Sequence, residues 1–172
     1  MKIYARLIPI VSKEIVEELR KEEDVEIADA KLSEAALDVG AVMRQYVEDE
    51  RKLNDEAKEE IFKRNLDYKN FKKIKEAVAE KKNFPLGDEG IDFVLDQIIE
   101  ALMISGNVEE VYSEDNILRK KMLAIMKKHF DLDEQLDAEV RGRIRNLQEG
   151  TLQWDIEYEK QLTELKRRKG LI

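Results

Sequence analysis

The chain has 172 residues, of which 42% are hydrophobic, so it is long and apolar enough to bury a core, and disorder is not the default expectation. Charged residues make up 41% of it, and the net charge of −8 argues against a surface that coats nucleic acid or an anionic membrane as a whole. The absence of cysteine excludes disulfides, thiolate metal sites, iron–sulfur clusters and cysteine nucleophiles.

The first third of the chain predicts a short helix followed by a long one. Pro9 suits the first turn of a helix, where its missing N–H costs nothing, and residues 9–22 carry apolar side chains near one face. After a break, Ser33 is expected to cap a helix that reaches about Asn65, because apolar residues recur there at three- and four-residue steps. A helix of this length is typical of an extended, coiled-coil-like arrangement.

The middle of the chain predicts two shorter helices separated by a clear break. Asp67 is expected to cap the third helix, and the sequence Asn-Phe-Pro-Leu-Gly at 83–87 marks the break after it. Asp88 is expected to cap the fourth helix, which has the most apolar stripe in the chain. Gly106 is the expected left-handed residue that ends this helix.

The last third predicts a second long helix and a final shorter one. The long helix is expected from about Asp115 towards Leu147, and an interruption near 131–133 stays open as an alternative. Gly150 breaks it, and a final helix begins near Leu152 and ends in Lys-Arg-Arg-Lys-Gly. Strand-like alternation is confined to residues 2–7 and 24–28, so the predicted class is all-α, a helical bundle with two long helices.

The two halves of the chain predict an internal duplication of a helix–link–long helix unit. An offset of about 83 residues superposes the first two helices on the fourth and fifth without a gap. The matched pairs include Val11 and Val94, Ile15 and Ile98, Leu19 and Leu102, Met43 and Met126, Leu53 and Leu136, and Phe71 and Trp154. The predicted repeats are residues 1–84 and 85–172, which can also pack together as one globule.

Four segments of the chain carry a family resemblance. They are RLIPIVSKEIVEEL, GDEGIDFVLDQIIEALMISGNVEEVY, IRNLQEGTLQWDIEYEK and LKRRKGL. Their order resembles an uncharacterised bacterial family catalogued only as a domain of unknown function, number five hundred and seven. The resemblance covers nearly the whole chain and implies a helical bacterial protein with no established activity. It therefore carries no catalytic residue over to this sequence.

The known enzyme and metal signatures are missing. There is no glycine-rich phosphate loop, no nucleophile elbow and no pair of Glu-x-x-His units. The single histidine, His129, has apolar neighbours and is expected at the edge of the core rather than as a base or ligand. Asp88, Asp92 and Asp96 form a ladder of carboxylates that a divalent cation could bridge, but acids also gather in the first turns of helices for the favourable dipole. We therefore predict no metal, no cofactor and no catalytic residue.

Candidate partner-binding residues lie in the C-terminal third: Arg141, Arg145, Trp154, Tyr158, Arg167 and Arg168. Arg141 and Arg145 are four residues apart, so they are expected to share one face of the second long helix, with the two rings as stacking surfaces. The alternative is that the arginines pair within the fold with Glu139, Glu149 or the all-acidic charges of 88–115, and that Trp154 fills the core.

Two glycines inside the long helices, Gly40 and Gly142, call for a structural reason. Glycine in a helix costs about 1 kcal/mol relative to alanine. We expect either a bend or the close approach of another backbone at these positions.

These features favour a structural or protein-interaction protein, an adaptor or scaffold that binds a protein partner or itself as a homo-oligomer. The alternative function is association with RNA or DNA through the basic C-terminal helices. An enzyme is less favoured, and no small-molecule substrate is identified. No apolar run approaches the ~20 residues of a membrane span, and the start lacks a signal peptide, so the expected location is the cytoplasm. The Lys- and Glu-rich, cysteine-free composition also resembles that of thermophilic proteins.

Overall fold

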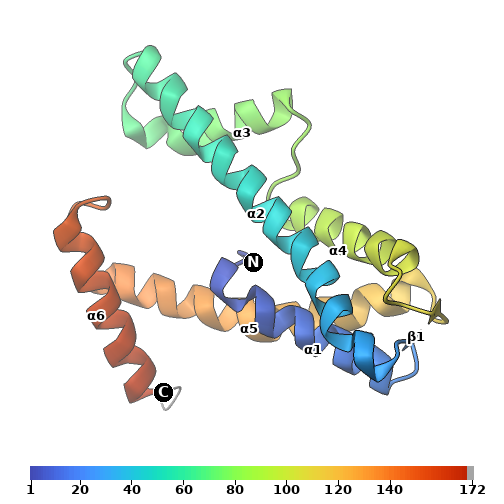
Figure 1. Cartoon of the computed structure of the whole chain (residues 1–172). Coiled ribbons are helices and arrows are strands. Elements are labelled where there is room, and N and C mark those ends of the chain that lie inside the picture. The colour runs from blue at the N-terminus through green and yellow to red at the C-terminus, as the bar shows by residue number, and fades with distance from the viewer. Residues whose placement is uncertain (170–172) are drawn as a thin grey trace.

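Helices hold most of residues 1–169, the part of the chain that the computed structural model describes (Figure 1). The helices are α1 (Ile8–Lys21), α2 (Leu32–Lys63), α3 (Phe71–Lys81), α4 (Gly87–Ile104), α5 (Asp115–Arg143) and α6 (Leu152–Arg168), and two strands, β1 (Val25–Glu26) and β2 (Glu110–Val111), form one small ladder. The predicted all-α class is confirmed. Gly170, the predicted end of the basic C-terminal tail, lies outside the described residues.

The main core lies where α1, the first half of α2, α4 and the first half of α5 meet. Each helix turns its apolar stripe inward because three- and four-residue spacing keeps those side chains on one face. The fully buried side chains include Val11, Ile15, Leu19, Val39, Met43, Leu95, Ile98, Leu102, Met122, Met126 and Phe130. Gly40 allows the close contact of α1 with α2, since an added Cβ would lie 3.3 Å from Ser12 Oγ. The tight contact between helices expected at Gly40 is therefore present, but the facing atom is a side-chain hydroxyl rather than another backbone.

Two helical hairpins extend beyond this core as arms. The first arm, residues 47–82, consists of the second half of α2 and α3, with Leu53, Ala57, Ile61 and Ala79 buried. The second arm, residues 131–168, consists of the second half of α5 and α6, and it has a small hydrophobic cluster of its own. Both arms leave the core towards the same side, and the N-terminus lies between them (Figure 1).

The strand ladder joins the two halves of the chain at the end of the molecule opposite the arms. β1 pairs antiparallel with β2, with Val25 opposite Val111. Beside the ladder, Asp24 is only 3% exposed, and its carboxylate accepts from Ser113 Oγ at 2.6 Å and from Lys121 Nζ at 2.6 Å. A buried charge that is paired and hydrogen-bonded in this way holds the link in one arrangement.

The end of α4 differs from the sequence expectation, whereas α5 is the continuous helix that was expected, without the interruption that was left open. Gly106 is not left-handed: α4 ends at Ile104, and the next residue, Ser105, is extended. The Ser105 hydroxyl accepts from the Asn107 N–H and donates to Asp38. α5 runs without interruption through 131–133, where Asp133 is buried and ion-paired with Arg6 from the N-terminal segment.

Two predicted caps are also wrong. α2 begins at Leu32, one residue before Ser33, and the turn of 3₁₀ helix at Asp29–Lys31 leads directly into it. α4 begins at Gly87, whose φ of +61° turns the chain into the helix, so Asp88 lies in the first turn. In the first turn the negative charge of Asp88 still interacts favourably with the positive end of the helix dipole.

The predicted repeats share one core. α1 of the first half packs on α5 of the second, and α2 packs on α4. The boundary at 84/85 lies in the loop between α3 and α4, so it is a break between helices.

Candidate functional site

The predicted partner-binding residues lie on the second arm. Gly150, with φ +86°, reverses the chain after α5, and Thr151 caps α6 by accepting from the Trp154 N–H at 3.2 Å. Leu162 and Leu165 of α6 are buried against Leu136 and Val140 of α5. The sequence therefore forms a hairpin here because a left-handed glycine, a threonine cap and matching apolar stripes coincide.

Arg141 is fully engaged within this hairpin. Its guanidinium binds Asp137 at 2.9 Å and Glu149 at 2.8 Å, and it lies over the rings of Trp154 and Tyr158 at 5.2 and 5.9 Å from their centroids. Burial lowers the pKa of Arg141, but the hydrogen bonds to Glu149 and Asp137 outweigh this and raise it. For Arg141, pairing within the fold is the alternative that the structure shows.

The two aromatic rings are part of the same stack. Trp154 and Tyr158 lie 4.9 Å apart with an angle of 18° between their planes, and the Tyr158 hydroxyl donates to Asp137 at 2.5 Å. Burial, followed by the hydrogen bond to Asp137, raises the pKa of Tyr158. Trp154 is half-buried and packs against the cluster of the second arm. The rings thus hold α6 on α5.

The remaining arginines of the predicted set are exposed. α5 ends at Arg143, so Arg145 lies in the turn that follows it and does not share a helix face with Arg141; that expectation is wrong. Arg167 and Arg168 lie in the last turn of α6. Within residues 1–169, none of these three side chains forms an ion pair.

His129 and one member of the carboxylate ladder, Asp96, have side-chain partners within the fold. His129 Nε2 lies 2.6 Å from Glu14, which also binds Lys128 at 2.7 Å, and the histidine side chain is 20% exposed at the core edge, as expected. Asp96 is ion-paired with Arg119. Among the described residues, no group of three or more metal-binding side chains is close enough to hold an ion.

A cleft between the two arms was not foreseen. It has a volume of about 500 Å³ and is lined by Met1, Lys2, Ile3, Tyr46, Glu50, Asn54, Lys58, Tyr68, Phe71, Lys75, Gly87, Ile91 and Glu149. α2 contributes Tyr46, Glu50, Asn54 and Lys58, which are four residues apart and lie along one face. This four-residue spacing is the one feature of the cleft that the sequence shows, because the other lining residues come from distant segments of the chain.

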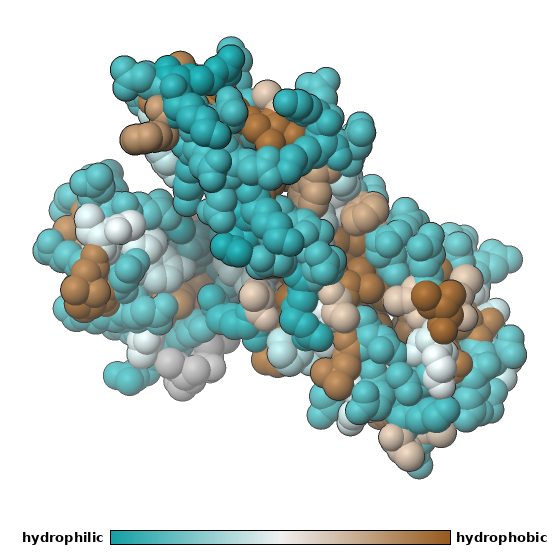
Figure 2. Space-filling view, turned by 45° about the horizontal axis from the view of Figure 1, so that its top comes forward, coloured by the Kyte–Doolittle hydropathy of each residue, from teal (hydrophilic) through white to brown (hydrophobic). Residues whose placement is uncertain are grey.

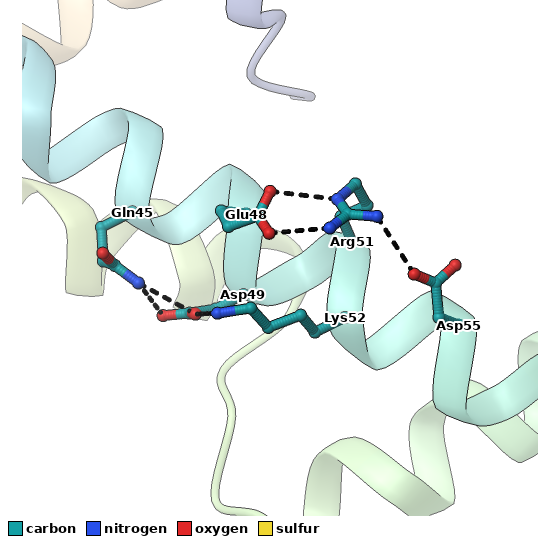
Figure 3. A network of polar contacts seen from close by, with 6 residues as sticks. All are labelled: Gln45, Glu48, Asp49, Arg51, Lys52 and Asp55. Carbon is teal, nitrogen blue, oxygen red and sulfur yellow. Dashed lines mark hydrogen bonds and ion pairs between the residues drawn. The ribbon is translucent and has the colours of Figure 1, made fainter.

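The solvent face of α2 is satisfied by local pairs (Figure 3). Arg51 binds Glu48 at 2.8 Å and Asp55 at 3.2 Å, and Asp49 accepts from Gln45 at 2.9 Å. The hydrogen bond from Arg51 lowers the pKa of Glu48. Pairs of this kind on an exposed helix are weak and local, so they do not mark this face of α2 as a binding site.

The N-terminal segment packs on α5 and lines the cleft between the arms. Arg6 is ion-paired with the buried Asp133, and Tyr4 packs beside them with only 9% exposure. Burial, together with the charges of Asp137 and Asp133, raises the pKa of Tyr4 to about 12. These contacts fix the segment to α5.

Large apolar side chains are exposed on both arms and at the end of α4. On the first arm Phe62 is 87% exposed, and on the second arm Leu152 is 75% and Ile156 is 62% exposed. Ile104, at the end of α4, is 86% exposed. Figure 2 shows separate apolar patches over the region of α6 and near the end of α4, each surrounded by polar surface.

The comparisons place the whole chain in one family. A family model described as "Protein of unknown function (DUF507)" matches residues 1–171. None of the curated proteins compared with the chain matches it. Within the described residues, no helix combines the length and the apolar character that crossing a membrane requires.

Proposed function

Because the chain belongs to the family described as Protein of unknown function (DUF507), we propose its function from its own surfaces: it is a protein-interaction scaffold whose two arms bind protein partners or a second copy. The observation that carries this proposal is the exposure of Leu152 and Ile156 on the outer face of α6. They are four residues apart and therefore neighbours on the helix surface. Contiguous exposed apolar surface that is rimmed by polar residues marks interaction sites, and this pair would be the centre of such a surface.

Three exposed arginines elsewhere on the second arm favour an acidic partner surface. Arg145, Arg167 and Arg168 are exposed on the same arm. Arginine is enriched at interface anchors, and rim charges accelerate association with a surface of opposite sign. The all-acidic stretch 88–115 of a second copy has the required charge, which is why self-association is part of the proposal.

We also propose that the two halves of the chain arose by duplication and that the protein acts in the cytoplasm. α1 ends at Lys21 and α4 at Ile104, 83 residues later, and α2 begins at Leu32 and α5 at Asp115, again 83 residues later. On this proposal the two arms arose from one duplicated unit. The scaffold would then have two arms of related structure that carry different surface side chains.

The test compares two charge substitutions on α6. We expect Ile156→Glu to weaken self-association or partner capture about tenfold or more, since burying a carboxylate in an apolar contact is costly. Gln153→Glu is the matched control, because Gln153 is exposed on the same helix and the charge change is identical. Sedimentation over a concentration series and affinity capture from host lysate supply the readouts. Equal behaviour of wild type, variant and control would remove α6 from the proposal.

The alternative function, binding to RNA or DNA, lacks its predicted stacking surfaces. Trp154 and Tyr158 stack on each other and lie under Arg141. Exposed Arg167 and Arg168 remain as phosphate contacts. If nucleic acid co-purifies with the wild type and is lost on replacing both arginines with glutamate, this function takes precedence over the protein scaffold.

A further inference from the structure

The cleft between the arms concentrates positive charge in an acidic protein. Its two carboxylates already have partners: Glu50 binds Lys75 at 2.8 Å, and Glu149 binds Arg141 at 2.8 Å. Lys58 lines the cleft and forms no ion pair within residues 1–169. Lys2 lies 5.1 Å from the centroid of the Tyr4 ring and has no carboxylate partner in the same part of the chain. The cleft is therefore left with uncompensated cations.

A flat aromatic wall lies on the α3 side of the cleft. Tyr68 and Phe71 stack at 5.3 Å with an angle of 14° between their planes, and Tyr68 stays 62% exposed. One face of the Tyr68 ring is thus covered by Phe71, and the rest of the ring is open to a ligand. An exposed tyrosine that is held by stacking offers a planar surface at little cost in side-chain entropy.

The side chain of Asn54 lines the same cleft and has an unmet hydrogen bond. Its Oδ1 atom is buried and has no partner in the structure. Buried polar atoms nearly always have a partner, so an unpaired one in the wall of a cleft indicates a missing donor. Amide side chains also recognise planar rings that carry adjacent donor and acceptor atoms.

From this arrangement we propose that the inter-arm cleft binds a small anion that carries a planar ring, of the class of nucleoside monophosphates. Lys58 and Lys2 bind the anionic group, Tyr68 stacks on the ring, and Asn54 accepts a hydrogen bond from it. The volume of about 500 Å³ is within the range of small-ligand sites. The site is independent of the outer face of α6, so it can hold whether or not the scaffold proposal does.

Calorimetric titration of the intact protein with adenosine monophosphate at low salt tests the proposal, with adenosine and inorganic phosphate as separate probes. We expect a dissociation constant of about 1 mM or tighter for the nucleotide, and weaker binding of both probes. Tyr68→Ala should weaken binding about tenfold, since base–aromatic stacking contributes about 1–3 kcal/mol. Lys58→Glu should weaken binding at low salt, and its remaining binding should depend less on salt than that of the wild type, because the attraction that salt screens is removed.

Lys72→Glu is the matched control, because Lys72 is an exposed lysine of α3 that does not line the cleft. Absence of nucleotide binding overturns the proposal. It is also overturned if phosphate alone binds as tightly as the nucleotide, or if Lys72→Glu weakens binding as much as Lys58→Glu does. Nucleotide-induced shifts of the Tyr68 ring resonances in the NMR spectrum, absent with phosphate, would support it independently of the variants.

Discussion

Burial changes the acid–base behaviour of Tyr46, which has its hydroxyl bonded to the Pro85 carbonyl at 2.9 Å and its ring stacked on Phe84. Burial, followed by the charge of Glu50, raises the pKa of Tyr46 from 10.0 to about 12. Because the folded pKa is the higher one, the associated stability is complete below pH 10 and is lost as pH rises through about 12. The direction is the same for Tyr4, whose pKa is also about 12.

We predict that Tyr46→Phe is less stable than wild type by about 1 kcal/mol at pH 8, because one hydrogen bond is lost. Above pH 10 the difference should shrink, since the phenylalanine ring does not titrate. Urea unfolding monitored by circular dichroism between pH 8 and 11.5 gives the free energy of unfolding of wild type and variant at each pH. Lysine deprotonation over this range affects both proteins alike. A difference that stays constant over this range would mean that Tyr46 ionises normally.

Gly90 has a packing role that no local pattern in the sequence indicates. An added Cβ would overlap the Tyr46 hydroxyl and lie 2.8 Å from the Pro85 carbonyl oxygen. We therefore predict that Gly90→Ala lowers the free energy of unfolding by about 1–3 kcal/mol. Gly142→Ala is the control: nothing lies within 4 Å of its added Cβ, so alanine there should stabilise α5 by about 0.5–1 kcal/mol. Chemical unfolding of the two variants should show changes of opposite sign in the free energy of unfolding. A Gly90→Ala variant as stable as the wild type would refute the close packing at Gly90.

Gly40 and Gly142 show how far residue-level prediction reaches. Both stood inside predicted helices, and sequence alone raised the same question at Gly142 and at Gly40. The answers differ because the neighbours come from elsewhere: Ser12 of α1 faces Gly40, whereas Gly142 faces open space. Local propensity shows that a glycine is costly, but only the tertiary structure shows what it permits.

At the scale of elements, α6 depends on the aromatic stack of the second arm. We predict that Trp154→Ala lowers the opening free energy of the α6 amides by about 2 kcal/mol, since a half-buried ring and its contact with Arg141 are removed. α4, in the main core, should keep its protection. Hydrogen exchange followed by mass spectrometry measures both helices in one experiment.

Leu152→Ala is the matched control for this prediction, because Leu152 begins the same helix and is 75% exposed. Exposed substitutions usually change stability by less than about 0.5 kcal/mol. If both variants loosen α6 equally, the stack is not what holds it.

Most elements were predictable because their apolar spacing is regular. The breaks at 83–87 and Gly150 are where the sequence placed them. The cleft was not predictable, because its α2 face meets the N-terminal segment, α3 and Glu149 only after both arms have folded. Nothing in the spacing of one helix specifies which segments will face it. The position of Arg145 in the turn after α5 was missed for a related reason: the helix ends at Arg143, so helical spacing no longer applies.

At the scale of the molecule, the two halves are structurally dependent on each other. The main core takes α1 and α2 from the first half and α4 and α5 from the second, and the strand ladder pairs one strand from each. A fragment of residues 1–84 would expose the faces of α1 and α2 that pack on α5 and α4. A small chain that loses half of its core rarely retains a stable fold.

We therefore predict that fragments 1–84 and 85–172 show weak helical signals and no cooperative thermal transition alone, and that an equimolar mixture recovers both. The control is the full chain with a protease site in the 82–86 loop, cut after folding, which should remain helical because that loop lies between α3 and α4. Circular dichroism of the fragments, the mixture and the cut chain distinguishes the cases. Cooperative melting of either fragment alone would show that the repeats are independent domains. Recovery on mixing would show that the shared core, rather than the covalent connection, makes the fold.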